Sequence, residues 1–110
     1  MIPKRELLGC PVLTTVNLIG NKWKLLILRD LFNGTKRFGE LRRSVHGISQ
    51  KVLTQNLKEL EKDGIIERKV YAEVPPRVEY KTNKLGQTIQ PIIAAMWKWG
   101  ETYQKKYKKN

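Results

Sequence analysis

The sequence predicts an α+β fold that is mainly α-helical with one small β-hairpin, and three observations lead to this prediction. A short helix, the turn at His46-Gly47 and an amphipathic helix over 49–63 form a helix-turn-helix pattern. Two segments rich in β-branched and aromatic residues follow, at 65–72 and 77–82. Apolar residues at helical spacing then recur over 85–107. Because a hairpin after a helix-turn-helix is a wing, the predicted architecture is a winged helix-turn-helix with extra helices at its two ends.

The N-terminal third is predicted to contain two helices. Pro11 suits the first position of a helix over 11–19, because its missing N–H is not needed there. Gly20-Asn21 separates this helix from a second one over 23–32, which Asn33-Gly34 ends. The second helix is apolar on nearly all sides, so we expect it to be central and buried.

The helix-turn-helix begins with a short helix over 38–45. After the turn, Ser49 is a favourable N-cap for the helix over 49–63, and Asp63-Gly64 is a favourable end. The apolar residues of this helix recur at spacings of four and three, which predicts a stripe facing the buried second helix: Leu53, Leu57 and Leu60.

The predicted C-terminal helix has a larger apolar face than one small domain can cover from within. Pro91 lies inside it and is expected to kink it or to mark a joint. We interpret the segments 10–20 and 85–107 as dimerisation helices; the alternative is packing within one chain over the winged core. The candidate interface residues are Val12, Val16, Ile92, Met96, Trp97, Trp99 and Tyr103.

Length and composition favour one domain over 1–110, with the helix-turn-helix and wing in about 36–82. The formal net charge is +12, and the isoelectric point is about 10.0. Such an excess of cations favours a polyanionic partner, above all double-stranded DNA, over an incidentally basic surface. The apolar fraction of 40% is enough for a core, which argues against global disorder.

Several classes of protein fit the sequence poorly. No stretch approaches the ~20 apolar residues of a membrane span, and residues 1–6 do not resemble a signal segment, so we expect a cytoplasmic protein without membrane contact. One cysteine and one histidine leave no intrachain disulfide and no Cys/His zinc site. No catalytic motif is visible, so we expect no enzyme, no metal and no cofactor.

The outer face of the predicted helix over 49–63 carries the side-chain types that read base edges in a major groove. Glutamine can pair with adenine, lysine can reach guanine, and threonine can meet a thymine methyl group or a phosphate. The candidate base-reading residues, called the reading face below, are Gln50, Lys51, Thr54, Gln55 and Lys58.

Other polar residues around this helix are candidates for contacts with the DNA backbone. For each single cation the alternative is a solvated surface charge, and for Arg77 it is pairing with Glu73 or Glu79. A capped helix N-terminus can also donate backbone N–H groups to phosphate. The candidates are Lys36, Arg37, Arg42, Arg43, Ser49 and, in the wing, Arg77.

Cys10 lies just before the first predicted helix, where a helix N-terminus favours thiolate over thiol, and Lys4 and Arg5 could add to this effect. A reactive thiol here could form a disulfide with another subunit or with a small thiol. The alternative is an inert, partly buried small residue. Cys10 is therefore a candidate redox sensor.

Several motifs, in order, resemble the HxlR-type family of bacterial winged helix-turn-helix regulators, relatives of the MarR group. They are Cys10-Pro11-Val12, the segments 20–28, 37–43, 47–55 and 57–64, then 75–80 and Trp99-Gly100. The resemblance implies a homodimer built from the first and last helices, which presents two recognition helices to a palindromic operator. Some family members sense electrophiles or oxidants through an N-terminal cysteine that matches Cys10.

These observations together predict a dimeric, sequence-specific DNA-binding transcriptional regulator, expected to be a repressor that binds an inverted repeat. Two alternatives stay open. The first is a redox-sensing version of the same regulator that acts through Cys10, and the second is a winged-helix protein-interaction module without specific DNA binding. A small-molecule or oxidant signal is compatible with the sequence, which does not identify one.

Overall fold

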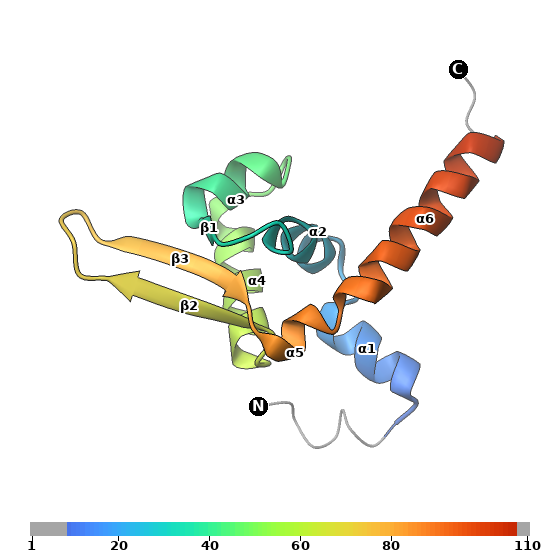
Figure 1. Ribbon diagram of the computed structural model, residues 1–110, viewed down its shortest axis with the longest axis horizontal. Coiled ribbons are helices and arrows are strands. Elements are labelled where there is room, and N and C mark those ends of the chain that lie inside the picture. Colours follow the sequence, from blue (N-terminus) through green and yellow to red (C-terminus); the bar gives the residue numbers. More distant parts are fainter. Residues whose placement is uncertain (1–8, 108–110) are drawn as a thin grey trace.

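The computed structural model describes residues 9–107, in which a winged helical core carries a long C-terminal helix that projects from it (Figure 1). The helix α1 lies beside the base of this projecting helix, and the hairpin extends from the opposite side of the core. The elements in chain order are α1 (Pro11–Ile19), α2 (Lys22–Leu31), β1 (Lys36–Arg37), α3 (Phe38–Ser44), α4 (Gln50–Lys62), β2 (Ile66–Tyr71), β3 (Arg77–Thr82), α5 (Lys84–Gln87) and α6 (Gln90–Tyr107).

The core forms around α2, as its apolar sequence predicts. This helix packs against α3, α4, β3 and the start of α6. Its residues Ile27 and Leu28 are fully buried, and they meet the predicted stripe of α4, which is also buried. The burial of Leu53, Leu57 and Leu60 leaves the opposite side of α4 exposed to solvent.

The sheet has three antiparallel strands in the order β1-β3-β2, where the sequence predicted a two-stranded hairpin. The strand β1 was missed because its two residues are too short to show an alternating pattern. Lys36 pairs with Tyr80 and Arg37 with Glu79 on the free edge of β3. The pairing of β1 with β3 connects the segment before α3 to the wing, so the wing and the helix-turn-helix are joined in one sheet.

The predicted C-terminal helix is divided into α5 and α6. Asn83 caps α5 by accepting a hydrogen bond from the backbone N–H of Gly86 (2.8 Å). Pro91 lies in the first turn of α6, where proline is tolerated, and the joint falls just before it. The expectation of a joint near Pro91 is therefore confirmed. No helix within residues 9–107 has the length and apolarity needed to cross a membrane.

Candidate nucleic-acid interface

The helix α4 begins at a well-formed cap and is held to the core by its apolar stripe. The hydroxyl oxygen of Ser49 accepts a hydrogen bond from the backbone N–H of Val52 (3.1 Å). Ser49 itself is exposed, so other backbone N–H groups of the first turn face solvent beside it. The first turns of α4 are thus rigidly placed and open to a partner.

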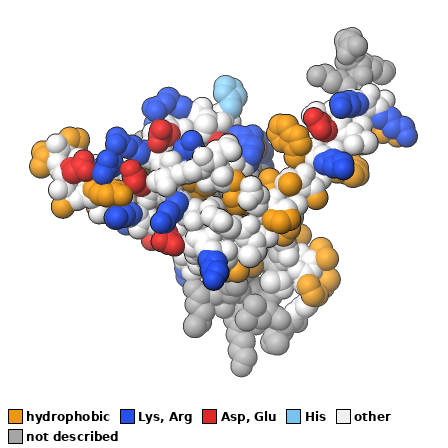
Figure 2. Space-filling view, in the orientation of Figure 1, with side chains coloured by type: hydrophobic (Ala, Val, Ile, Leu, Met, Phe, Trp, Pro, Cys, Tyr) orange, Lys and Arg blue, Asp and Glu red, His pale blue; other side chains and the backbone are white. Residues whose placement is uncertain are grey.

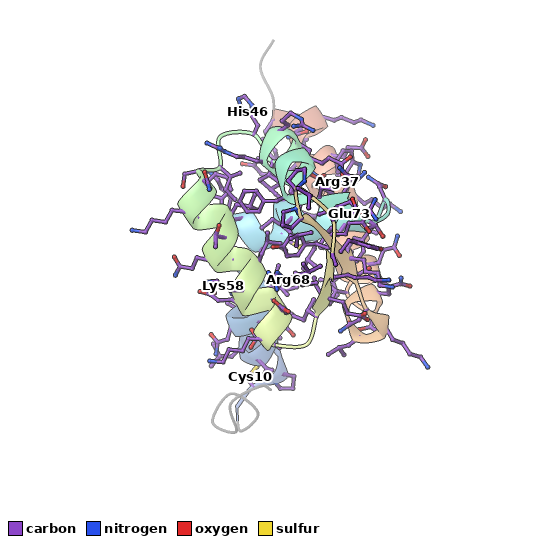
Figure 3. The ribbon with its side chains drawn as sticks, turned by 90° about the vertical axis from the view of Figure 1, so that its left-hand side faces the viewer. Cys10, Arg37, His46, Lys58, Arg68 and Glu73 are labelled. Atoms are coloured by element: carbon purple, nitrogen blue, oxygen red, sulfur yellow. The ribbon has the colours of Figure 1, made fainter. Side chains whose placement is uncertain are left out.

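The five residues predicted for the reading face lie together on the solvent side of α4, which Figure 3 views from outside. Thr54 is half-buried, and the other four residues are exposed. With Glu59 they line one shallow concavity of about 600 Å³. Glu59 was not predicted as part of this surface, although its spacing of four from Gln55 indicates that the two side chains are neighbours.

Two polar contacts beneath α4 fix it against α2. The Nζ atom of Lys24, which is only 6% exposed, lies 2.6 Å from Oε1 of Glu59. The hydrogen bond from Lys24 lowers the pKa of Glu59 below its ordinary value. The Nδ2 group of Asn21 donates to Oδ1 of the buried Asn56 (3.2 Å). A rotation of α4 about its axis would break both contacts.

Figure 2 shows Lys and Arg side chains over the winged core, interspersed with Asp and Glu. Of the cations predicted to contact the DNA backbone, Lys36 and Arg43 line one concavity, and Arg37 lines another beside the hairpin turn. Arg42 and Arg43 are exposed on α3, and Arg37 is exposed at its start. Lys36 is half-buried in β1. The Ser44 hydroxyl donates to the buried Asp30 carboxylate of α2 (2.6 Å), which fixes the end of α3 to the core. The backbone that carries these cations is therefore held in place by the core and by the sheet.

In the wing, Arg77 is engaged with its own hairpin. Its Nη2 lies 3.1 Å from Oε2 of Glu73, and its Nε lies 3.7 Å from Oε2 of Glu79. Its guanidinium carbon is 3.9 Å from the ring centroid of Tyr71. The structure thus shows the pairing with Glu73 and Glu79 that the sequence left open as the alternative. Arg68, labelled in Figure 3, is exposed on β2.

Cys10 is exposed at the N-cap of α1. The backbone N–H groups of Leu13 and Val12, at the start of α1, hold the pKa of its thiol below the ordinary cysteine value. The expectation that the helix start favours thiolate is consistent with this direction. Lys4 and Arg5, which the sequence analysis considered as contributors, lie outside the described residues.

The residues predicted for a dimer interface are all exposed in the single chain. Positions 92, 96, 99 and 103 follow one another at spacings of four, three and four, which places them on one face of α6. The rings of Trp99 and Tyr103 stack there with 5.4 Å between centroids. Trp97 is exposed elsewhere on the helix.

A groove of about 220 Å³ separates α1 from α5 and the start of α6. It is lined by Leu18, Ile19, Leu85 and Ile92 among others.

Comparisons with known proteins agree with this geometry. The family described as HxlR-like helix-turn-helix matches residues 18–108. The uncharacterized HTH-type transcriptional regulator YdeP of Bacillus subtilis (strain 168) is 50% identical over 96 residues, which cover 87% of this chain and 75% of YdeP.

The redox regulator HypR provides two similar solved structures. Its oxidized form is 47% identical with a TM-score of 0.81, covering 84% of this chain and 96% of that chain. Its reduced form is 45% identical with a TM-score of 0.83, and the match covers 86% of this chain and 94% of that chain. The winged fold, the capped helix α4 and these matches show that the chain belongs to the HxlR-like helix-turn-helix family of DNA-binding transcriptional regulators.

Proposed function

We propose that the protein is a homodimeric repressor that reads an inverted-repeat operator with the reading face of α4. The observation that carries this proposal is the arrangement of α4 itself. Its apolar stripe is fully buried, its start is capped, and the amides, hydroxyl and cations on its other side are accessible. An α-helix presented in this way fits a major groove. The proposal includes a cytoplasmic location.

We assign contacts with the DNA phosphate backbone to four cations and to the peptide N–H groups beside Ser49. The cations are Lys36, Arg37, Arg42 and Arg43. Their exposure or position on β1 and α3 supports this assignment. Phosphate contacts fix the position of a protein on DNA without reading its sequence. For Arg77, the pairs with Glu73 and Glu79 favour a role in holding the wing over direct contact with DNA.

The dimer is proposed to form through α1 and α6. An exposed apolar face with four aligned residues on α6, and Val12 and Val16 on α1, is costly in water and is relieved when a second copy covers it. A two-fold dimer places two copies of α4 in successive major grooves, so half-site centres are expected about one helical turn apart or a small multiple of it.

Fluorescence anisotropy tests the proposal with an operator selected from a randomised duplex library and a scrambled duplex of equal length, over a salt series. We expect preferential binding to the selected duplex and a steep fall in affinity with salt. Failure to enrich any sequence, or equal binding to both duplexes, would contradict sequence-specific recognition. Absence of salt-sensitive binding would favour the protein-interaction module.

A redox-sensing role for Cys10 is a second candidate, favoured by the exposure of Cys10 and by the direction of its pKa. The similarity to HypR, a redox regulator, adds support. Two Cys10 thiols of a dimer, or one Cys10 and one small thiol, would give two electrons and two protons to an oxidant such as diamide and form a disulfide. Operator release by diamide that is lost in Cys10→Ser supports this role, and a response that survives the substitution excludes it.

A further inference from the structure

A chain of three polar side chains runs from the core to the reading face. Nζ of Lys24, on α2, lies 2.6 Å from Oε1 of Glu59. The other oxygen of the same carboxylate, Oε2, accepts a hydrogen bond from Nε2 of Gln55, at 3.4 Å. Lys24 is buried, Glu59 has a side chain that is 44% exposed, and Gln55 is exposed. The base-reading candidate Gln55 is therefore connected, through one carboxylate, to a fixed cation in the core.

The charge of Glu59 determines which way the Gln55 amide faces. An ionised carboxylate only accepts hydrogen bonds, so it attracts the NH₂ end of the amide and repels the carbonyl end. A glutamate is ionised at neutral pH, and the hydrogen bond from Lys24 lowers the pKa of Glu59 further below its ordinary value. Since a free glutamine amide can rotate between two nearly equivalent orientations, the contact with Glu59 selects one of them.

The selected orientation leaves a defined pattern for DNA. A primary amide has two N–H bonds. The one trans to the carbonyl oxygen points back along the side chain and can donate a hydrogen bond to a neighbour on the same helix, here Glu59. The carbonyl oxygen and the second N–H then remain side by side as an acceptor and a donor. Adenine offers the matching pair in the major groove, the N6 amino donor and the N7 acceptor, whereas guanine offers two acceptors, O6 and N7.

We propose that Glu59, held by Lys24, is a positioning residue that makes Gln55 specific for adenine over guanine at one position in each half-site. Binding guanine would require the amide to turn its NH₂ group toward the base and its carbonyl toward the Glu59 carboxylate. The inference rests on the proposed base reading by α4, and it deepens that proposal by naming the base and the residues that choose it.

The experiment compares selected operators that carry adenine or guanine at each position, using full-length protein and anisotropy titrations. The parent is expected to prefer adenine by about tenfold or more at one symmetry-related position. Gln55→Ala identifies that position, because it removes the preference there. Glu59→Gln is expected to reduce the preference to within about threefold, because a neutral amide accepts either orientation of Gln55.

Two further variants separate orientation from folding and from general electrostatics. Glu59→Gln leaves the buried Lys24 without a charged partner, so the double variant Lys24→Met/Glu59→Gln replaces the pair with neutral groups of similar size. It is expected to show the same loss of preference with an intact thermal transition. Glu61→Gln removes one exposed carboxylate from the same helix and is expected to keep the tenfold preference.

Additional outcomes separate this inference from the function on which it depends. In a Gln55→Ala background, Glu59→Gln is expected to change the adenine-to-guanine ratio no further, since the two residues act as one unit. If Glu59→Gln and the double variant both retain the preference while Gln55→Ala loses it, the positioning role is overturned and base reading by α4 stands. If no operator can be selected at all, the proposed function itself fails.

Discussion

The guanidinium of Arg77 stacks on the ring of Tyr71, with 3.9 Å between the guanidinium carbon and the ring centroid, while its Nη2 lies 3.1 Å from the Glu73 carboxylate. Tyr71 ends β2 and Arg77 begins β3, and the two residues face each other in the strand register. One side chain therefore joins both strands to the turn between them. We therefore expect Arg77 to stabilise the conformation of the wing.

The contacts of Arg77 within the wing predict how its substitution affects DNA binding. Arg77→Gln is expected to weaken operator binding without changing the slope of log affinity against log salt, because the charge of Arg77 is already matched by Glu73 and Glu79. Arg77→Lys is expected to resemble Arg77→Gln, since a lysine cannot reproduce the planar stack and fork. Anisotropy titrations over a salt series measure both slopes. Recovery of binding by Arg77→Lys would assign the residue to a phosphate contact instead.

Arg43 is expected to behave differently, because it is exposed on α3 and has no ion-pair partner among the pairs found within residues 9–107. Arg43→Gln is expected to weaken binding to selected and scrambled duplexes alike and to lower the salt slope by about one unit per recognition helix. Gln55→Ala, as the comparison, should alter base preference and leave the slope unchanged. A normal slope in Arg43→Gln would remove Arg43 from the backbone contacts.

At Gly86, α5 lies directly against the backbone of Ile65. A Cβ atom at this position would lie 2.1 Å from the backbone carbonyl oxygen of Ile65, which cannot move aside easily. Gly86→Ala is therefore expected to lower the free energy of unfolding by about 1–3 kcal/mol, measured by urea denaturation. Gly39→Ala is the matched control, because its Cβ would meet only the end of the flexible Arg43 side chain at 3.4 Å. The control should leave stability unchanged or raise it by up to ~1 kcal/mol.

The proposed dimer interface predicts a change of oligomeric state. Met96→Glu places a charge in the middle of the apolar face of α6, which should yield a monomer in sedimentation experiments and reduce operator affinity by about 100-fold or more. Lys98→Gln changes the charge of α6 by the same amount outside that face and should leave both properties intact. A dimer that persists in Met96→Glu would point to a different interface.

The lowered pKa of Cys10 predicts how its reactivity depends on pH. A lower pKa means that a larger fraction of the thiol is ionised at any pH below the ordinary cysteine value, and thiolate is the reactive form. The rate of iodoacetamide alkylation should therefore reach half of its maximum at a lower pH than for N-acetylcysteine amide, a reference thiol without a neighbouring charge, under the same conditions. Equal midpoints for the two thiols would show that the start of α1 has no influence on Cys10.

Features that depend on local chemistry could be predicted from the amino-acid sequence. The cap at Ser49, the end at Asp63-Gly64 and the leucine spacing are signals within one turn or two, so they predicted α4 and its accessible face. The strong apolarity of the second helix likewise predicted the centre of the core. The leucine spacing also predicted which side of α4 is accessible to a partner, although it did not predict the burial of Asn56.

Contacts between distant segments could not be predicted in this way, because they depend on how the helices and strands pack. The strand β1 exists because β3 offers a free edge, and two residues alone carry no pattern that reveals it. Lys24 and Glu59 are 35 positions apart, so their pairing follows from the packing of α2 on α4. The turn between β2 and β3 likewise brings Arg77 onto Tyr71. Spacing along one helix or strand predicts its faces, whereas the partner that meets each face is set by how the whole chain packs.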